Sequence, residues 1–547
     1  MQGTTTQIES KHMKNAKLTA LNIERFKSFE HATRIELAPL TIILGRNNSG
    51  KSSIIQSLLL LKQTLNDPRS DVTLRLDGPL VEAFNLRELT FGWPVASNRV
   101  KGPTITLEWE CEVDIAEAFE NAGMPDSENL ATHSELPWLK TASGRQIFKT
   151  SMTLRTAEIE NTTVISKIEI RALNRNIKTA LIKIDLENDP WCCYWGKAHG
   201  DKIEIELDHF IPYLRINRSQ VGPRHRQRAW YNAYVILFAQ PLEALKKLLS
   251  EFHYLGSSRQ PPPSLFKPAT TAPGEIGVNG ELAAQLLHRR QHDTVHYLPP
   301  LQIEDGQIKP HKKVLELSLV DAVNQVMTDL SITTPLRVKE IEQVGFQLMF
   351  GDASLVHVGR GLNSLLPLVE LGLFSDPLRF TSTSGSMGLA SYQKKCSSFS
   401  HIALEEPEAH LHPKVASRLA HWLVSLALAN RRLIVETHSD HLVRRLRGLA
   451  ARAGHGSKLE QWLLENVVVL SVEQSDDGGS TVTSSRLTAE GGVEEQWPAD
   501  FMDEATDEES AIYYAKLDKS EQAESVLQSK SMFKVIEGDE PESDEAP

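Results

Sequence analysis

The sequence predicts an α/β fold in which two lobes, far apart along the chain, together build one head domain. Three observations support this fold class. A glycine-rich turn joins an apolar strand to an apolar helix at Gly45–Ser52, two further apolar strands lead into Glu405 and His438, and the segment between the lobes alternates with period two. We therefore expect a β-rich plus helical insertion between the two lobes.

Length and composition indicate a globular chain with several domains. A chain of 547 residues is too long to fold around a single hydrophobic core, so two or three domains are expected. The net charge of −12 excludes a uniformly basic surface for nucleic acid, so such binding needs a local patch or a partner. Only 4 cysteines occur, without zinc spacing, and no apolar run is long enough to span a membrane, which favours a cytoplasmic location.

The glycine-rich turn carries the strongest functional signal. An apolar strand, Thr41–Leu44, precedes the pattern G-x-x-x-x-G-K-S, and an apolar helix follows it. The two glycines let successive N–H groups point at one phosphate, and the helix N-terminus adds its dipole. Lys51 is placed for the β- and γ-phosphates, and the Ser52 hydroxyl is placed for Mg²⁺. The predicted nucleotide-binding residues are Gly45, Arg46, Asn47, Asn48, Ser49, Gly50, Lys51, Ser52 and Ser53.

The first lobe is expected at residues 17–100, after a flexible N-terminus at residues 1–16. Alternating patterns around Arg25–Phe29 predict a hairpin that leads into the strand before the turn. Phe26 or Phe29 could stack on adenine, but an ordinary core position is at least as good an interpretation for each.

Two kinds of insertion follow the first lobe. Residues 101–230 alternate with period two and predict a largely antiparallel, β-rich segment, whereas residues 231–340 predict helices separated by irregular linkers. Within the second segment we expect helices at residues 231–254 and 314–330.

A basic stretch closes the β-rich segment. Its arginines precede Trp230 and Tyr231, and basic residues beside aromatic ones can grip a nucleic-acid backbone and stack bases. A solvated loop, or pairing with acids elsewhere, is an equally good interpretation. The candidate contacts are Arg215, Arg218, Arg224, Arg226 and Arg228.

The second lobe is expected at residues 341–475. An apolar strand that ends in Glu405 and Glu406 is typical of a Walker B motif, in which one carboxylate serves Mg²⁺ and the next orients the attacking water. His438 follows another apolar strand, where an imidazole can reach the γ-phosphate. A second possible phosphate-facing helix start contains Gly359, Arg360, Gly361 and Asn363.

These motifs, in this order, resemble an ABC-type ATPase, and more closely the soluble branch that includes the OLD ATPases and the SMC chromosome proteins. The resemblance implies that ATP and Mg²⁺ are bound between two heads, the glycine turn of one facing Gly359–Gly361 of the other. By this resemblance Glu405 is the Mg²⁺-side acid, Glu406 the catalytic base and His438 the switch histidine. The chain departs in three places from the motifs of ABC transporters: at Glu405, at the segment around Gly359–Gly361 (the signature-like segment), and at His412. These departures imply slow turnover of ATP.

Within that branch the chain looks most like PtuA, the ATPase of Septu and retron-linked antiphage systems. The resemblance implies a head-to-head dimer or higher oligomer that works with a separate HNH nuclease, PtuB. In retron versions it also works with a reverse transcriptase and its msDNA. Residues 476–547 are expected to form a C-terminal extension with an acidic tail, and no intrinsic nuclease is expected. The alternative is a RecF- or SMC-like repair ATPase that binds DNA itself.

Overall fold

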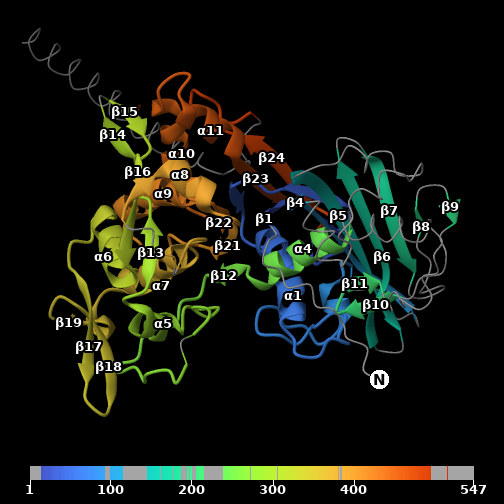
Figure 1. Cartoon of the computed structure of the whole chain (residues 1–547), viewed down its shortest axis with the longest axis horizontal. Helices are drawn as coiled ribbons and strands as arrows, with labels where there is room; N and C mark the ends of the chain where they lie inside the picture. The colour runs from blue at the N-terminus through green and yellow to red at the C-terminus, as the bar shows by residue number, and fades with distance from the viewer. Residues whose placement is uncertain are drawn as a thin grey trace, which may run out of the picture. The chain divides into compact units, whose positions relative to one another are not determined.

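The fold was obtained as a computed structural model of the whole chain (Figure 1). The structure describes residues 14–92, 99–114, 145–159, 162–174, 177–185, 194–195, 198–199, 205–214, 238–271, 273–304, 306–379, 381, 385–494 and 514. The chain divides into two compact units, Met1–Gln496 and Trp497–Pro547. Every element below belongs to the first unit. The basic stretch Arg215–Arg228 lies outside the described residues, as do most of residues 1–16 and of the acidic tail.

A six-stranded sheet, here called the central sheet, carries the strands that lead to the motifs. Its first five strands run parallel, and its last strand is antiparallel. The motif strands are apolar and buried on both faces, as parallel strands covered by helices must be. Because the strands are parallel, their carboxyl ends meet at one edge, which is where ligands bind in open α/β sheets. In spatial order the strands are β12 (His253–Leu255), β21 (Ser400–Glu405), β22 (Arg431–Glu436), β3 (Leu40–Gly45), β23 (Val467–Gln474) and β24 (Ser480–Arg486).

A second six-stranded sheet is antiparallel throughout. Strand β1 pairs with β4 over its length, with Leu21 opposite Leu107. The alternating segment after residue 99 therefore continues the sheet that the first lobe begins, and the sheet crosses the boundary expected near residue 100. In spatial order the strands are β2 (Thr33–Glu36), β1 (Lys14–Glu24), β4 (Arg99–Asp114), β5 (Arg145–Ile159), β6 (Thr162–Asn174) and β7 (Ile177–Asp185).

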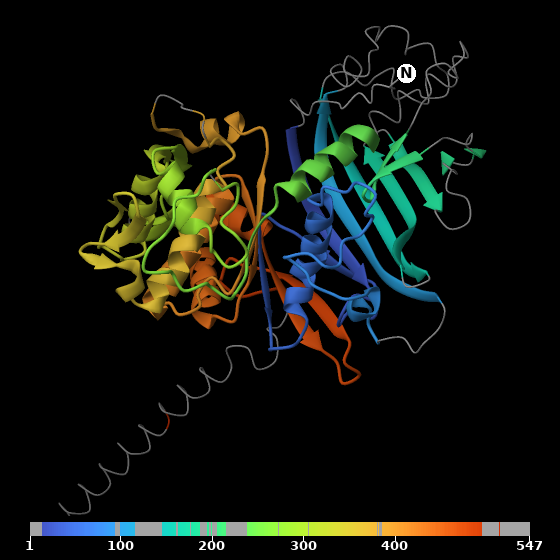
Figure 2. The ribbon, with the colours of Figure 1, turned by 90° about the horizontal axis from the view of Figure 1, so that it is seen from below.

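Two helices pack into the core that the two sheets share. Helix α1 (Lys51–Leu65) is buried along almost its whole circumference, and α4 (Gln240–Ser250) lies beside it and across the antiparallel sheet (Figure 2). Trp109 of that sheet donates its indole N–H to Pro241 O of α4 at 3.0 Å. Phe26 and Phe29 are fully buried in this core, so their interpretation as core residues is confirmed.

The remaining elements lie around the two sheets, and the small strands between residues 194 and 214 lie on the side of the antiparallel sheet (Figure 1). Helix α7 contains Pro367 and packs against α5 and α6. The helices are α5 (Ala283–Arg290), α6 (Leu319–Asp329), α7 (Arg360–Phe374), α8 (Leu389–Lys395), α9 (Pro413–Leu428), α10 (Asp440–Arg452) and α11 (Lys458–Asn466), with 3-10 turns η1 (Leu86–Leu89) and η5 (Leu355–His357). The small strands are β8 (Tyr194–Trp195), β9 (Ala198–His199), β10 (Ile205–Asp208), β11 (Ile211–Leu214), β13 (Thr294–Tyr297), β14 (Gln302–Glu304), β15 (Gln307–Lys309), β16 (Lys313–Ser318), β17 (Leu336–Ile341), β18 (Gly345–Phe350), β19 (Ala353–Ser354) and β20 (Met387–Gly388).

Two expected helices are partly wrong. The helix expected at residues 231–254 ends at Ser250, and His253–Leu255 forms the edge strand β12. The helix expected at residues 314–330 begins only at Leu319, because Lys313–Ser318 forms strand β16 and pairs antiparallel with β13. Ser318 then caps the helix by accepting from the Asp321 backbone N–H at 3.3 Å.

Candidate nucleotide site

The glycine-rich turn has the geometry that the sequence predicts. Strand β3 ends at Gly45 and α1 begins at Lys51, with Gly50 in the left-handed region at φ 99°. A Cβ added to Gly45 would lie 2.3 Å from Val472 O, and one added to Gly50 would lie 2.2 Å from Ser28 Oγ. Only glycine therefore fits at either end of this turn.

Lys51 folds back over the turn. Its Nζ donates to Gly45 O at 3.0 Å and to Arg46 O at 2.7 Å. Burial lowers the pKa of this ammonium, and the charges of Glu436 and Glu406 oppose that shift. The cation thus lies within the loop whose N–H groups would surround a phosphate.

Ser52 connects the turn to the neighbouring strand. Its hydroxyl donates to Glu436 Oε1 at 2.9 Å, and Glu436 is the last residue of β22. Burial, followed by the charge of Glu405, raises the pKa of Glu436 to about 7. The sequence reasoning assigned no role to Glu436, although it ends an apolar strand just as Glu405 does and pairs with Glu405 across the sheet.

Glu405 is buried beside Glu436 in the cluster of acids. It is 9% exposed, and its Oε1 has no hydrogen-bond partner among the described residues. Burial raises its pKa, while hydrogen bonding from Tyr254 and from the Ser257 backbone lowers it. Arg259 Nη2 donates to Glu405 O at 3.2 Å. Tyr254 and Arg259 come from β12 and the loop after it, which the sequence reasoning had not placed near the site.

Glu406 turns out of the sheet toward His438. Its φ of 43° is in the left-handed region, and its backbone N–H donates to Glu436 O at 2.8 Å. Its Oε1 lies 3.9 Å from His438 Nε2, and both side chains are partly exposed. Burial and then the charge of Lys51 lower the pKa of His438, whereas Glu406 raises it. Lys51, Glu406 and His438 thus share one electrostatic environment.

Glu408 connects the loop after β21, which carries the acids, to the loop after β22, which carries His438. Its Oε1 accepts from Thr437 Oγ1 at 2.6 Å and from the His438 backbone N–H at 3.0 Å. Burial raises the pKa of this carboxyl group, and the hydrogen bond from Thr437 opposes that shift. The sequence reasoning had given Glu408 no role, because only the fold brings the two loops side by side.

The signature-like segment, Gly359–Asn363, begins helix α7. Gly359 precedes the helix with open space around it, and a Cβ on Gly361 would lie 2.7 Å from His410 O. The segment therefore packs on the loop that follows Glu406. The turn at Gly45–Ser53, the four acids and His438 converge at the sheet edge, while Gly361 contacts the loop after Glu406 through His410.

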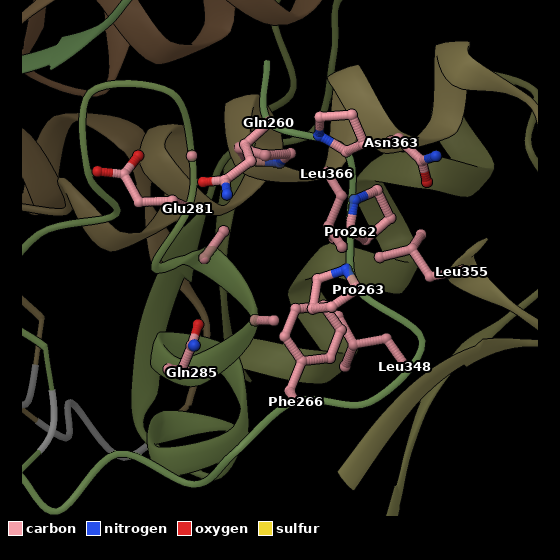
Figure 3. A pocket seen from close by; sticks show the side chains of 15 residues that line it. Gln260, Pro262, Pro263, Phe266, Glu281, Gln285, Leu348, Leu355, Asn363 and Leu366 are labelled. Carbon is pink, nitrogen blue, oxygen red and sulfur yellow. The ribbon is translucent and has the colours of Figure 1, made fainter.

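A pocket opens beside this segment (Figure 3). Its volume is about 250 Å³, and it lies between the loop after Arg259 and helices α5 and α7. Gln285 Oε1 and Asn363 Oδ1, on two of its lining residues, are buried without a hydrogen-bond partner among the described residues. The sequence showed only a proline run here, Pro261–Pro263, which was interpreted as an irregular linker.

Comparisons with known proteins agree with this geometry. Residues 17–190 and 387–443 match the family model described as an AAA ATPase domain. The two matched segments hold the glycine-rich turn, the paired acids and His438, so these motifs are similar to those of an AAA ATPase domain and lie in two separated parts of the chain. The predicted α/β fold class, with two lobes far apart in the sequence and an insertion between them, is confirmed. No curated protein sequence matches.

Among solved structures, heads of SMC proteins are similar at low identity. The SMC head bound to the C-terminal winged-helix domain of ScpA is 13% identical, with TM-score 0.34, covering 86% of this chain and 98% of that one. The SMC head of Thermotoga maritima is 11% identical, with TM-score 0.30, covering 85% and 98%. An SMC head derived from Pyrococcus furiosus, bound to the C-terminal domain of ScpA, is 12% identical, with TM-score 0.33, covering 86% and 96%. No functional statement follows from similarity at this level.

Across the part of the chain that the structure describes, no helix is both long enough and apolar enough to cross a membrane.

Proposed function

We propose that this protein binds ATP with Mg²⁺, closes two heads over the nucleotide, and uses that closure to control a separate nuclease in antiphage defence. The observation that best supports ATP binding is that Lys51, Ser52 and Glu436 lie together at one edge of the central sheet. A phosphate would replace the loop carbonyls as the partner of the Lys51 ammonium, because ammonium–phosphate bonds are charge-assisted.

The residues present fit a Mg²⁺ ion, a hard cation that takes oxygen ligands. Ser52 offers a hydroxyl, and Glu405 and Glu436 each offer a buried carboxyl oxygen without a partner among the described residues. Ser52 and Glu405 would hold the ion, which when bound would neutralise developing charge on the phosphates.

Glu406 is the proposed general base. It is the most exposed acid of the cluster, and its left-handed backbone directs it away from the buried pair. There it would orient the attacking water and accept its proton. His438 would donate to the γ-phosphate, and its backbone is fixed for that role by Glu408.

The dimer is supported by the position of the signature-like segment. Gly359 has no other atom near its Cβ position, so this end of α7 is open to a second copy. A nucleotide held on Lys51 of one copy would then meet Gly359–Gly361 and Asn363 of the other.

The defence role is supported by the resemblance of the motif set to PtuA. The proposed partners are an HNH nuclease of the PtuB type and, in a retron setting, a reverse transcriptase with msDNA. A slow ATPase suits this role, because the closed state must persist long enough to report a signal.

Purification from the native operon tests the defence role. We expect an HNH nuclease to copurify, and we expect metal-dependent cleavage of DNA or tRNA only when that partner is present. Cleavage by the chain alone would contradict the division of labour. Tight DNA binding by the chain alone, without a nuclease partner, would favour the RecF-like repair function instead.

A further inference from the structure

The peptide unit that joins Glu405 to Glu406 is held from both sides. Its carbonyl, Glu405 O, accepts from Arg259 Nη2 at 3.2 Å, and its N–H, on Glu406, donates to Glu436 O at 2.8 Å. Glu436 ends β22, on one side of β21 in the central sheet, whereas Arg259 lies in the loop after β12, on the other side. Both polar groups of this one peptide are therefore fixed by neighbouring elements.

Glu406 is the residue that this peptide positions. Its φ of 43° is in the left-handed region, which a residue with a side chain adopts only where the surrounding structure enforces it. Pro407 follows, and a residue before proline is disfavoured in the right-handed helical region, so a released Glu406 would move to an extended conformation. That change would carry its carboxylate away from His438 Nε2, which now lies 3.9 Å from Glu406 Oε1.

The loop that carries Arg259 is itself held in place. The backbone N–H of Gln260 donates to Asn279 O at 3.1 Å, which joins this loop to the segment before α5. That segment is bonded in turn to α1, because Glu275 pairs with Lys62 Nζ at 2.5 Å and the Lys62 side chain is only 2% exposed. Arg259 is therefore anchored to the helix that begins at the glycine-rich turn.

The hydrogen bond to Glu405 O is what orients the guanidinium of Arg259. Its Nε and Nη1 have no hydrogen-bond partner among the described residues. Burial lowers the pKa of Arg259 to about 10, while its interactions with Tyr254, Glu405 and Glu406 oppose that shift, so the group is a cation at neutral pH. A hydrogen bond from a charged donor is stronger than one from a neutral donor, which suits Arg259 to holding a peptide in place.

We propose that Arg259 is a positioning residue for ATP hydrolysis: it holds the Glu405–Glu406 peptide so that the Glu406 carboxylate is directed at the attacking water. This role rests on the proposed function, in which Glu406 is the general base. The phosphates would be held by Lys51 and the glycine-rich turn. Loss of Arg259 should therefore slow the chemical step and leave ATP affinity unchanged.

Steady-state kinetics and calorimetry of Arg259 variants of the full chain test this role. In Arg259→Gln we expect kcat to fall about tenfold to a hundredfold, the usual cost of misplacing a catalytic group by about 1 Å, with Kd for ATP within about twofold of the parent. Arg259→Lys should recover most of the lost turnover, since one ammonium N–H is enough for a single bond to a carbonyl. The matched control is Arg418→Gln on α9, which removes a guanidinium that donates to Asp329 O at 3.1 Å and should turn over like the parent.

A double variant shows whether Arg259 acts through Glu406. If it does, Arg259→Gln should cost no further turnover once Glu406→Gln has removed the base, because two residues that act as one unit are not additive. Thermal unfolding checks that each variant is folded. A full further loss of turnover in the double variant, a loss of ATP affinity in place of turnover, or a parental rate in Arg259→Gln would overturn the proposal.

Crystal structures of the parent and of Arg259→Gln test the positioning without any measurement of activity. We expect Glu406 to leave the left-handed region in the variant and its N–H to separate from Glu436 O. Glu406 retained near φ 43° in the variant would overturn the proposal. If the parent binds ATP but does not hydrolyse it, the proposed function fails, and this pair of structures alone decides whether Arg259 positions Glu406.

Discussion

At the scale of single residues, the buried carboxyl group of Glu436 makes stability depend on pH. Its pKa is about 7 in the folded chain, above the ordinary 4.5. The folded state therefore keeps the proton between these values, and the stability that this proton confers is lost as pH rises through the window.

The variant Glu436→Gln tests this linkage. We expect it to be as stable as the parent near pH 5 and more stable near pH 8, by up to about 3 kcal/mol, because an amide carries no charge to bury. Denaturant unfolding at both pH values measures the difference. A constant difference across the range would show that Glu436 does not titrate there.

Lys51 is the residue on which nucleotide affinity depends. Its two hydrogen bonds are to loop carbonyls, so Lys51→Ala should leave the fold intact and remove the charge that phosphate requires. We expect loss of ATP binding in calorimetry, with unchanged thermal unfolding, while the exposed control Lys394→Ala binds normally. Normal affinity in Lys51→Ala would remove the P-loop assignment.

At the scale of elements, the sequence predicted the motif-bearing strands and the helix after the turn because their apolar runs and glycines are local signals. It could not show that Glu436 and Glu408 join the site, since that depends on β21 and β22 being neighbours in the sheet. The alternation of apolar and polar residues in β4 also could not show which strand lies beside it, and the structure pairs it with β1. The edge strand β12 was missed because three residues are too few to show a period.

The packing of α7 gives a prediction with an internal control. A methyl group on Gly361 would collide with His410 O at 2.7 Å, whereas Gly359 has open space. We expect Gly361→Ala to keep ATP affinity but lower turnover at least about tenfold, because the clash shifts the helix start that would face the second nucleotide. The control is Gly388→Ala at the start of α8, outside the nucleotide site, where the nearest atom to an added Cβ is 4.0 Å away, and it should turn over like the parent. Equal effects of the two variants would contradict this account of α7.

At the scale of the whole molecule, the two lobes meet because β3 of the first lies between β22 and β23 of the second. The nucleotide site therefore exists only when the distant segments fold together. Head closure, in turn, is proposed to couple that site to a second copy and to a partner.

The most direct test of this account is the behaviour of Glu406→Gln with ATP and Mg²⁺. The amide keeps the size of the side chain but cannot accept a proton, so turnover should fall by about 10²–10⁴, the usual contribution of a general base. Affinity for ATP should persist, and sedimentation should show a dimer with ATP that is absent with ADP and absent in Lys51→Ala/Glu406→Gln. Turnover equal to that of the parent, or the same sedimentation profile with ATP and with ADP, would contradict the claim that Glu406 is the general base for ATP hydrolysis between two closed heads.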